Sequence, residues 1–435
     1  MNPLPAALEK LGPASADTLA RHLGVSTITI SRYVKSAGAA VVTLGRGQHT
    51  LYALPLFAYS ERAQWPLFWV SEAGEVSEFA TATLLKPGAL HLYRAPLSLL
   101  NASDLGWPLF PLHLRGYLGR AQRARLGAVA QAWDGQPERW SVAQRVFAAQ
   151  SSALDHAGAV LFGEGALSAW QEACARSPQV EADYDSLAAE ASAGRIAGSS
   201  ADGEQPKFST RVADAHGEVR DVLVKFSPPR GTSFGERWND LLRAEAHAAA
   251  VLAAVGFAVP HTRIVGGART YLESARIDRV GRYGRRHLLP LAAVHGAFVP
   301  GNPQSWPATV KSLVLQKRLP LDALLTTQTL YAFGQLIGNT DMHFGNLGVI
   351  AASPEQLAQG KFSLAPVYDM LPMRFAPSPH SDGHFGYTAF TPELSLALPE
   401  AVRTQAHALA RHFWLRCAND AHSSVAWRAF AAERA

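Results

Sequence analysis

The residues whose side chains are best suited to catalysis or metal binding lie between Gly338 and Asn346, in the stretch G-N-T-D-M-H-F-G-N. This stretch contains Asp341, His343 and Asn346, and a further acid, Asp369, follows in P-V-Y-D-M-L-P. A positioned carboxylate can take a proton from a hydroxyl group, and carboxylate and amide oxygens are ligands that Mg²⁺ accepts. The residue types therefore indicate a site that combines a general base with a metal ion.

Asp341 and Asn346 have the D-x-x-x-x-N spacing of a protein-kinase catalytic loop, in which the Asp accepts the hydroxyl proton and the Asn holds a metal ion. The spacing alone is a weak signal, so its meaning depends on the rest of the chain. A metal-dependent hydrolase is an alternative, because Asp341, His343 and Asp369 could share a metal ion if Asp341 and His343 lay on a strand. That alternative leaves the elements described next without a role.

Two earlier segments could bind phosphates. Residues 198–208 read G-S-S-A-D-G-E-Q-P-K-F, and small residues between two glycines let backbone N–H groups approach phosphates closely, although a plain surface loop has the same composition. Then D-V-L-V-K-F predicts a strand that carries Lys225. A lysine among Val and Leu needs a partner if it is buried, and Glu245 on a strongly helical stretch could supply it. An exposed lysine on an edge strand is the alternative.

The next segments complete an order of parts that suits phosphoryl transfer. T-Y-L-E-S-A-R-I-D-R predicts a strand and a hinge, where the backbone near Ala275 and Ile277 could meet adenine and Asp278 a ribose hydroxyl. A long helix over 321–338 then leads into the opening motif. Phosphoryl transfer requires mainly positioning and charge neutralisation, so we expect Asp341 as the base, Asn346 and Asp369 as Mg²⁺ ligands, and Lys225 on the phosphates.

The N-terminal residues predict a second function. Residues 15–37 predict two helices, capped by Ser15 and Ser26 and separated by a turn at Gly24, and residues 41–54 predict a β-hairpin with a basic tip. These elements resemble winged helix-turn-helix repressor domains, whose second helix enters the major groove of DNA. A helix pair used only for packing or dimerisation is the alternative. The residues expected to contact DNA are Ser26, Thr27, Thr29, Ser31, Arg32, Lys35 and Arg46.

Charge and composition agree with a DNA-binding N-terminus on a globular chain. Residues 1–54 hold five basic and two acidic residues, a net charge of +3, whereas the whole chain of 435 residues has +5. This concentration favours a nucleic-acid partner, although an ordinary solvated face could carry the same charge. Cys174 and Cys417 match no metal or disulfide pattern, which favours a cytoplasmic location. The N-terminus does not read as a signal peptide. Residues 288–310 form the longest uncharged run, but four prolines make it a poor membrane span, so no membrane partner is expected.

The combination of motifs resembles the HipA family of bacterial serine/threonine kinase toxins, and with the fused N-terminal module the chain looks like the YjjJ-type members. The motifs that carry the resemblance are D-H-A-G-A-V-L-F at 155–162, S-A-D-G-E-Q-P-K-F at 200–208, V-L-V-K at 222–225, R-I-D-R at 276–279, G-N-T-D-M-H-F-G-N at 338–346 and Y-D-M-L at 368–371. The sequence departs from the family at Ile277, where an aromatic is usual, and at Ala275, where an acid is common. Backbone contacts would tolerate both changes.

The resemblance implies an α+β, bilobal protein-kinase-like fold preceded by a winged helix-turn-helix domain. We expect the DNA-binding domain at 1–54, a small α+β subdomain at 55–165, an ATP-binding part at 166–280 and a mostly helical part at 281–435. The nucleotide-binding positions implied are Asp202, Gly203, Glu204, Gln205, Pro206, Lys207, Lys225, Ala275, Arg276, Ile277, Asp278, His343, Asn346 and Tyr368.

The family also implies cofactors, partners and regulation. ATP with Mg²⁺ would serve phosphorylation of a protein Ser or Thr, and family members also phosphorylate a loop serine, which matches Ser200 here with Ser199 adjacent. Relatives act on aminoacyl-tRNA synthetases, so such an enzyme or another translation component is the expected substrate. A separate antitoxin and a homodimer are further expected partners. The alternative is a DNA-binding transcriptional regulator whose kinase-like portion is a non-catalytic ligand or interaction module.

Overall fold

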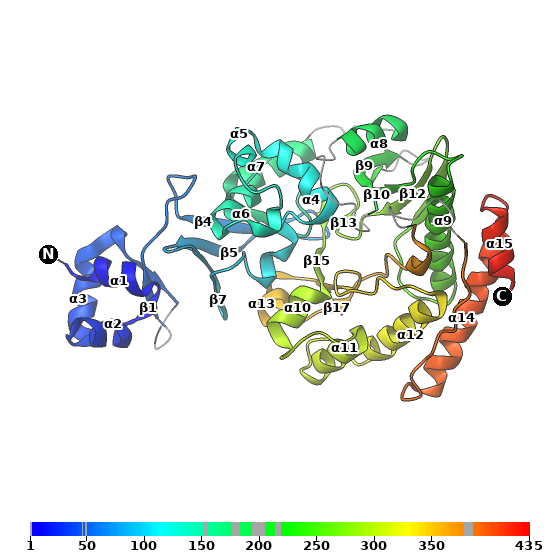
Figure 1. The fold of residues 1–435 in the computed structure, drawn as a ribbon. Coiled ribbons are helices and arrows are strands. Elements are labelled where there is room, and N and C mark those ends of the chain that lie inside the picture. Colours follow the sequence, from blue (N-terminus) through cyan, green and yellow to red (C-terminus); the bar gives the residue numbers. More distant parts are fainter. Residues whose placement is uncertain are drawn as a thin grey trace. The chain divides into compact units, whose positions relative to one another are not determined.

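The computed structural model describes residues 2–45, 47, 50–151, 155–175, 183–193, 205–213, 219–377 and 386–435. Helices and strands are mixed along the chain (Figure 1). Two compact units form: one contains Met1–Arg115, Gln122–Arg176 and Ser353–Gln359, and the other contains Gly116–Ala121, Ser177–Ala352 and Gly360–Ala435. We call them the first and second unit. The four-part division expected from the sequence stays a prediction.

The first unit begins with three helices and a small antiparallel sheet. The elements are α1 (Leu4–Leu11), β1 (Ala14–Ser15), α2 (Ala16–Leu23), α3 (Thr27–Ala37), β2 (Val42–Leu44) and β3 (Leu51–Ala53), and the strand order is β1-β3-β2. The side chains of Ser15 and Ser26 accept from the backbone N–H groups of Thr18 and Thr29, which is why α2 and α3 begin where they do. The predicted helix pair and hairpin are therefore present.

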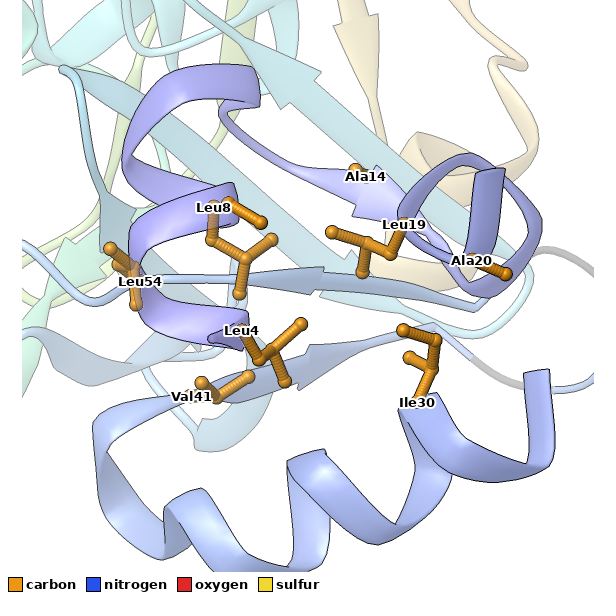
Figure 2. Packing of buried hydrophobic residues seen from close by; sticks show 9 residues of the cluster. Leu4, Leu8, Ala14, Leu19, Ala20, Ile30, Val41 and Leu54 are labelled. Atoms are coloured by element: carbon orange, nitrogen blue, oxygen red, sulfur yellow. The ribbon is translucent and has the colours of Figure 1, made fainter. Parts of the chain in front are cut away.

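The core of this N-terminal part is small and apolar. Figure 2 shows Leu4, Leu8, Leu19 and Ile30 converging between the helices and strands, and all four are fully or almost fully buried. Helix α1, which supplies two of them, was not predicted. A proline in the first turn of a helix is well tolerated, because its fixed backbone angle suits the helix start.

The rest of the first unit is built on a five-stranded antiparallel sheet in the order β7-β6-β5-β4-β8. Its strands are β4 (Gln64–Val70), β5 (Val76–Leu85), β6 (Ala89–Arg94), β7 (Leu97–Asn101) and β8 (Val160–Phe162). Helices α5 (Ala128–Gln131), α6 (Val142–Ala149), α7 (Gly163–Ala175) and α13 (Pro354–Gln359) accompany it, while α4 (Gly116–Arg123) belongs partly to each unit. The chain enters the sheet directly from β3, since Lys86 N–H donates to Leu54 O and Leu56 N–H to Leu84 O.

The second unit starts with helix α8 (Tyr184–Ala193) and a four-stranded antiparallel sheet in the order β11-β12-β10-β9. The strands are β9 (Lys207–Ala213), β10 (Val219–Phe226), β11 (Thr262–Gly266) and β12 (Thr270–Ala275), and helix α9 (Ser233–Ala254) packs on β11 and β12. Side chains alternate faces along a strand. In β10 this alternation puts Val222, Val224 and Phe226 into one apolar cluster and turns Lys225 to the opposite face.

The remaining part of the second unit is mostly helical. It contains the short strands β13 (Arg279–Val280), β14 (Gly284–Arg285), β15 (His287–Pro290), β16 (Gly348–Ala351) and β17 (Ser363–Leu364), and the helices α10 (Leu291–Phe298), α11 (Trp306–Leu315), α12 (Asp322–Ile337), α14 (Glu400–Ala418) and α15 (Val425–Ala432). Helix α14 packs against α9, α12 and α15 (Figure 1). Among the described residues, none of the helices has the length and apolarity to cross a membrane.

Helix α12 delivers the chain into the motif that opened the sequence analysis. The helix ends at Gly338, whose φ of 78° lies in the left-handed region that favours glycine. A Cβ atom at Gly338 would also lie only 2.9 Å from Phe390. Both facts explain why glycine stands at the start of the loop.

Candidate active site

Three charged side chains meet inside the second unit. Lys225 is 6% exposed, and its Nζ lies 2.7 Å from Oε1 and 2.8 Å from Oε2 of Glu245 on α9. The same ammonium group donates to Asp369. Strand β10 lies inside the sheet between β12 and β9, so the alternative of an exposed edge-strand lysine is wrong.

The charges of this trio shift one another's protonation. Burial alone would lower the pKa of Lys225, but the carboxylates of Asp369 and Glu245 raise it above its ordinary value. Burial raises the pKa of Glu245, and Lys225 opposes this only in part. Burial, the largest single influence, acts to raise the pKa of Asp369, yet the attraction of Lys225 and Lys207 and the hydrogen bond from Lys225 together outweigh it and leave that pKa lowered. Asp369 is therefore the more firmly ionised of the two acids.

Asp369 also has an unusual backbone. Its φ of 54° lies in the left-handed region, which costs a residue with a side chain about 1 kcal/mol or more. Such conformations persist only where surrounding contacts enforce them. Here the ion pair with Lys225 holds the side chain and the amide of Asn339 reaches the backbone oxygen of Asp369, at 3.4 Å.

The segment from Asp341 to Asn346 is an irregular loop between α12 and β16, not a strand. The Asn346 side-chain Nδ2 donates to the backbone oxygen of Asp341 at 2.8 Å and lies 3.4 Å from its Oδ2. His343 is exposed, its Nδ1 accepts from Gly345 N–H at 2.9 Å, and its Nε2 lies 3.9 Å from Asp341 Oδ1. The loop thus brings the predicted base and the predicted amide ligand together.

The metal-dependent hydrolase interpretation loses its structural premise here. It required Asp341 and His343 two residues apart on a strand, where both side chains would point to one face, but this loop has no such alternation. Within the described ranges, no group of three or more His, Cys, Asp or Glu side chains is placed to hold a metal ion. Asp341, His343 and Asp369 therefore do not form such a group.

Two residues that the sequence analysis did not single out position this loop. The buried Asn339 accepts from Asp341 N–H through Oδ1, at 3.0 Å, and donates through Nδ2 to Asp369 O, so one amide links both acids. Trp306 on α11 donates from its indole N–H to His343 O at 3.0 Å. Asn339 lies inside the motif and could have been found there. Trp306 is remote in sequence and gave no signal.

Tyr368 holds the other side of the loop. Its hydroxyl donates to Gly345 O at 2.8 Å, and burial raises the pKa of Tyr368 above its ordinary value. The side chain is therefore a neutral phenol that fixes the backbone just before Asn346. Its predicted contact with a nucleotide stays a prediction.

The predicted hinge is held by backbone and guanidinium contacts. Ala275 N–H donates to His261 O and Arg276 N–H to Asp221 O, at 2.8 and 3.0 Å. The buried Asp278 accepts from Arg276, at 2.8 and 3.0 Å, and from Arg279, at 2.5 Å. Asp278 therefore neutralises arginines in this structure, and the roles of Ala275, Ile277 and Asp278 toward adenine and ribose stay predictions.

The described end of the predicted phosphate loop is tied to β10. Gln205 donates to Phe226 O at 2.5 Å, and Phe226 N–H donates to Pro206 O at 3.1 Å. Lys207 pairs in register with Lys225 and contributes to the lowered pKa of Asp369. The other predicted loop positions lie outside the described residues: Ser199, Ser200, Asp202, Gly203 and Glu204.

The predicted DNA-contacting residues lie on α3 and around its start. Thr27, Ser31, Arg32 and Lys35 are exposed. Ser26 and Thr29 are partly used within the helix, because their hydroxyls lie 3.0 Å apart and Ser26 caps Thr29 N–H. Arg46 lies outside the described residues, and DNA contact by this set stays a prediction.

Two known protein families match most of the chain. The family described as HipA-like C-terminal domain matches residues 199–432, and the family described as YjjJ-like toxin, middle domain, matches residues 61–171. The protein named Toxin YjjJ of Escherichia coli strain K12 is 35% identical over 429 residues, which cover 97% of this chain and 94% of that protein.

Two solved structures are more distant. The HipA of Shewanella oneidensis MR-1, solved with HipB and its operator DNA, is 14% identical with a TM-score of 0.46, over 85% of this chain and 91% of that chain. The Helicobacter pylori proinflammatory kinase CtkA is 15% identical with a TM-score of 0.29, over 38% of this chain and 55% of that chain. The family matches confirm the predicted resemblance and fold class, and the chain belongs to the HipA-like toxin family as a YjjJ-like member.

Proposed function

We propose that the second unit is a serine/threonine protein kinase that transfers a phosphoryl group from ATP to a protein hydroxyl. The observation that carries the proposal is the buried Lys225, held between Glu245 and Asp369, together with the amide of Asn339 that joins Asp369 to the loop of Asp341. These parts supply the cation, the carboxylate and the base that phosphoryl transfer requires.

The donor atoms fit a magnesium ion and a nucleotide. Nδ2 of Asn346 donates to Asp341 O, so its amide oxygen is the atom that remains for a cation. The lowered pKa of Asp369 keeps its carboxylate charged, and Mg²⁺ prefers such oxygen ligands. When bound, Mg²⁺ and ATP would supply the phosphoryl group and offset its charge.

The roles of the chain's own residues follow from their contacts. Asp341 would accept the proton of the attacking hydroxyl through its carboxylate, which is about half exposed and so reachable by a protein substrate. Lys225 would orient the phosphates while Glu245 fixes its direction. Asn339 and Trp306 would keep the Asp341 loop in place by hydrogen bonds to its backbone.

Phosphoproteomics tests the substrate side of this proposal. The wild-type chain, Asp369→Asn and the matched control Asp322→Asn would each be expressed, and proteins that gain phosphate would be identified by mass spectrometry. Asp322 begins α12 and is exposed. We expect serine or threonine phosphorylation of a translation component, such as an aminoacyl-tRNA synthetase, with wild type and the control only. The same phosphoproteins in all three samples would refute the kinase assignment.

The loop serines and the partners complete the proposal. We expect autophosphorylation at Ser200, or at the adjacent Ser199, and phosphopeptide mapping of wild type beside Ser200→Ala would locate the label. A separate antitoxin and a homodimer are further proposals drawn from the family. Label outside residues 199–200 would remove the loop from the regulation proposed here.

We also propose DNA binding by the N-terminal part. The exposed face of α3 carries Thr27, Ser31, Arg32 and Lys35, and the net charge of +3 in residues 1–54 attracts phosphates. If the second unit proved inactive as a kinase, this part would still support the alternative of a DNA-binding transcriptional regulator. DNA binding that survives deletion of residues 1–54 would refute the assignment.

A further inference from the structure

The outward face of helix α3 carries an isoleucine beside two cations. Ile28 is 66% exposed. Three more exposed residues follow it at helical spacing: Ser31, Arg32 and Lys35. A helix turns about 100° per residue, so these four side chains fall within about 100° of one another. Figure 2 shows Ile30 pointing from α3 into the core, and Ile30 lies about 160° around the helix from Ile28, so the face with Ile28 points away from that core.

The opposite face of α3 supplies the packing of the helix. Ile30 is fully buried there, and Tyr33, Val34 and Ala37 pack against the same cluster of apolar residues. Ile28 adds little to this core, because two thirds of its side chain stays in water and hydrophobic stabilisation follows the area removed from water. A partner that covered Ile28 would gain that stabilisation.

The hydroxyl groups at the start of α3 are engaged within the helix. Ser26 Oγ accepts from Thr29 N–H at 3.2 Å and lies 3.0 Å from Thr29 Oγ1, and Ser31 Oγ donates to Thr27 O at 3.2 Å. A β-branched side chain such as that of Ile28 keeps essentially one χ1 rotamer in a helix. The first turn of α3 therefore offers Ile28 as an apolar group that is already fixed in direction.

The surroundings of Ile28 fit duplex DNA. Arg32 and Lys35 lie roughly 6 and 10 Å further along the helix axis, where they can bind phosphates. In helix-turn-helix proteins, residues near the start of the second helix contact the edges of bases in the major groove. Thymine presents a C5 methyl group in that groove, and apolar side chains contact it. The charge of this face selects a polyanion, and its apolar group selects a base that carries a methyl.

We propose that Ile28 reads a thymine in the major groove, through van der Waals contact between its side chain and the C5 methyl group. This inference rests on the DNA binding proposed above and adds the residue that gives it sequence preference. Arg32 and Lys35 bind phosphates, which carry no sequence information directly. Cytosine at the same position would lack the methyl and would place its N4 amino donor against an apolar side chain without a partner.

Replacing thymine by deoxyuridine tests the proposal, because deoxyuridine keeps the base-pairing edge and lacks only the C5 methyl. The wild-type full chain first selects duplexes from a random pool, and each thymine of the selected duplex is then replaced in turn. Fluorescence anisotropy gives the Kd of every duplex for wild type, Ile28→Ala and the matched control Leu315→Ala. Leu315 is also an exposed aliphatic residue, at 74%, but lies on α11 in the second unit. Thermal melting verifies that each variant folds.

We expect deoxyuridine at one or more positions to weaken binding by wild type about fourfold, the value of one buried methyl group. The same replacement should leave the Kd of Ile28→Ala unchanged, while Leu315→Ala should respond as wild type does. An equal loss for wild type and Ile28→Ala would overturn the proposal, and so would binding without any sequence preference, although DNA binding itself would stand in both cases. A full chain that binds no duplex would refute the inference and the DNA-binding assignment together.

Discussion

Replacing Lys225 by methionine should destabilise the second unit more than almost any other lysine substitution. The side chain of Lys225 is 8% exposed, that of Glu245 is also 8% exposed and that of Asp369 is 26% exposed, so the change leaves two acids in a poorly hydrated place without their cation. Removing one partner of a buried ion pair costs about 3–5 kcal/mol. We expect the free energy of unfolding to fall by that amount in urea denaturation at pH 7.5.

Two comparisons separate this electrostatic cost from lost packing. Lys311→Met makes the same change at an exposed position on α11 and should alter stability by less than about 0.5 kcal/mol. Glu245→Gln added to Lys225→Met removes one of the two uncompensated charges and should recover more than about 1 kcal/mol. Equal losses for Lys225→Met and Lys311→Met, or strictly additive losses in the double variant, would refute the reasoning.

The pH dependence of the free energy of unfolding provides a further test. Burial raises the pKa of Glu245, and without Lys225 that pKa rises further. An acid whose folded pKa exceeds its unfolded value binds more protons when folded, so its contribution is favourable at low pH and is lost as pH rises through the folded pKa. The difference in free energy of unfolding between wild type and Lys225→Met should therefore become smaller as the pH falls from 8 to 5. A gap that widens on acidification would contradict the account.

Three other perturbations test separate parts of the chain. Ile30→Ala should destabilise the N-terminal core by about 2–5 kcal/mol in denaturant, because Ile30 is fully buried, whereas Ile28→Ala, at an exposed position, should change little. Burial, with a contribution from Arg145, lowers the pKa of His113 to about 4, below its unfolded value. The free energy of unfolding of wild type should therefore fall by up to about 3 kcal/mol as the pH falls from 6.5 towards 4, and that of His113→Gln should change less over the same range. Arg32→Ala should weaken DNA binding and reduce its salt slope by about 1, and binding identical to wild type would contradict the α3 interface.

Much of the fold could be predicted because local signals agreed with the final structure. The run of Val and Leu in D-V-L-V-K-F predicted β10, the Ala- and Leu-rich stretch around Glu245 predicted α9, and Ser15 and Ser26 marked the starts of α2 and α3. In these places the residue pattern and the tertiary packing favour the same element. Helix α1 was not predicted because its few apolar residues show their purpose only when they meet Ile30 across the core.

The site was predictable in composition but less so in its contacts. The spacing of Asp341, Asn346 and Asp369 identified the acids and the amide, yet it did not indicate that Asn339 would join them. Contacts made over long sequence separations leave no local pattern, as with Trp306 and His343. Asp278 shows the same limit, since its pairing with Arg276 and Arg279 depends on how the chain folds back at β13.

The most direct test of the central claim is phosphoryl transfer by the purified full chain. Wild type and Asp341→Asn would be incubated with labelled ATP, Mg²⁺ and a cell lysate, and the initial rate of label incorporation into protein would be compared. Asp341→Asn retains the backbone contacts of the loop but cannot accept the hydroxyl proton, so the rate should fall by about 10² or more. Equal rates for the two proteins, or no label from wild type, would contradict the account.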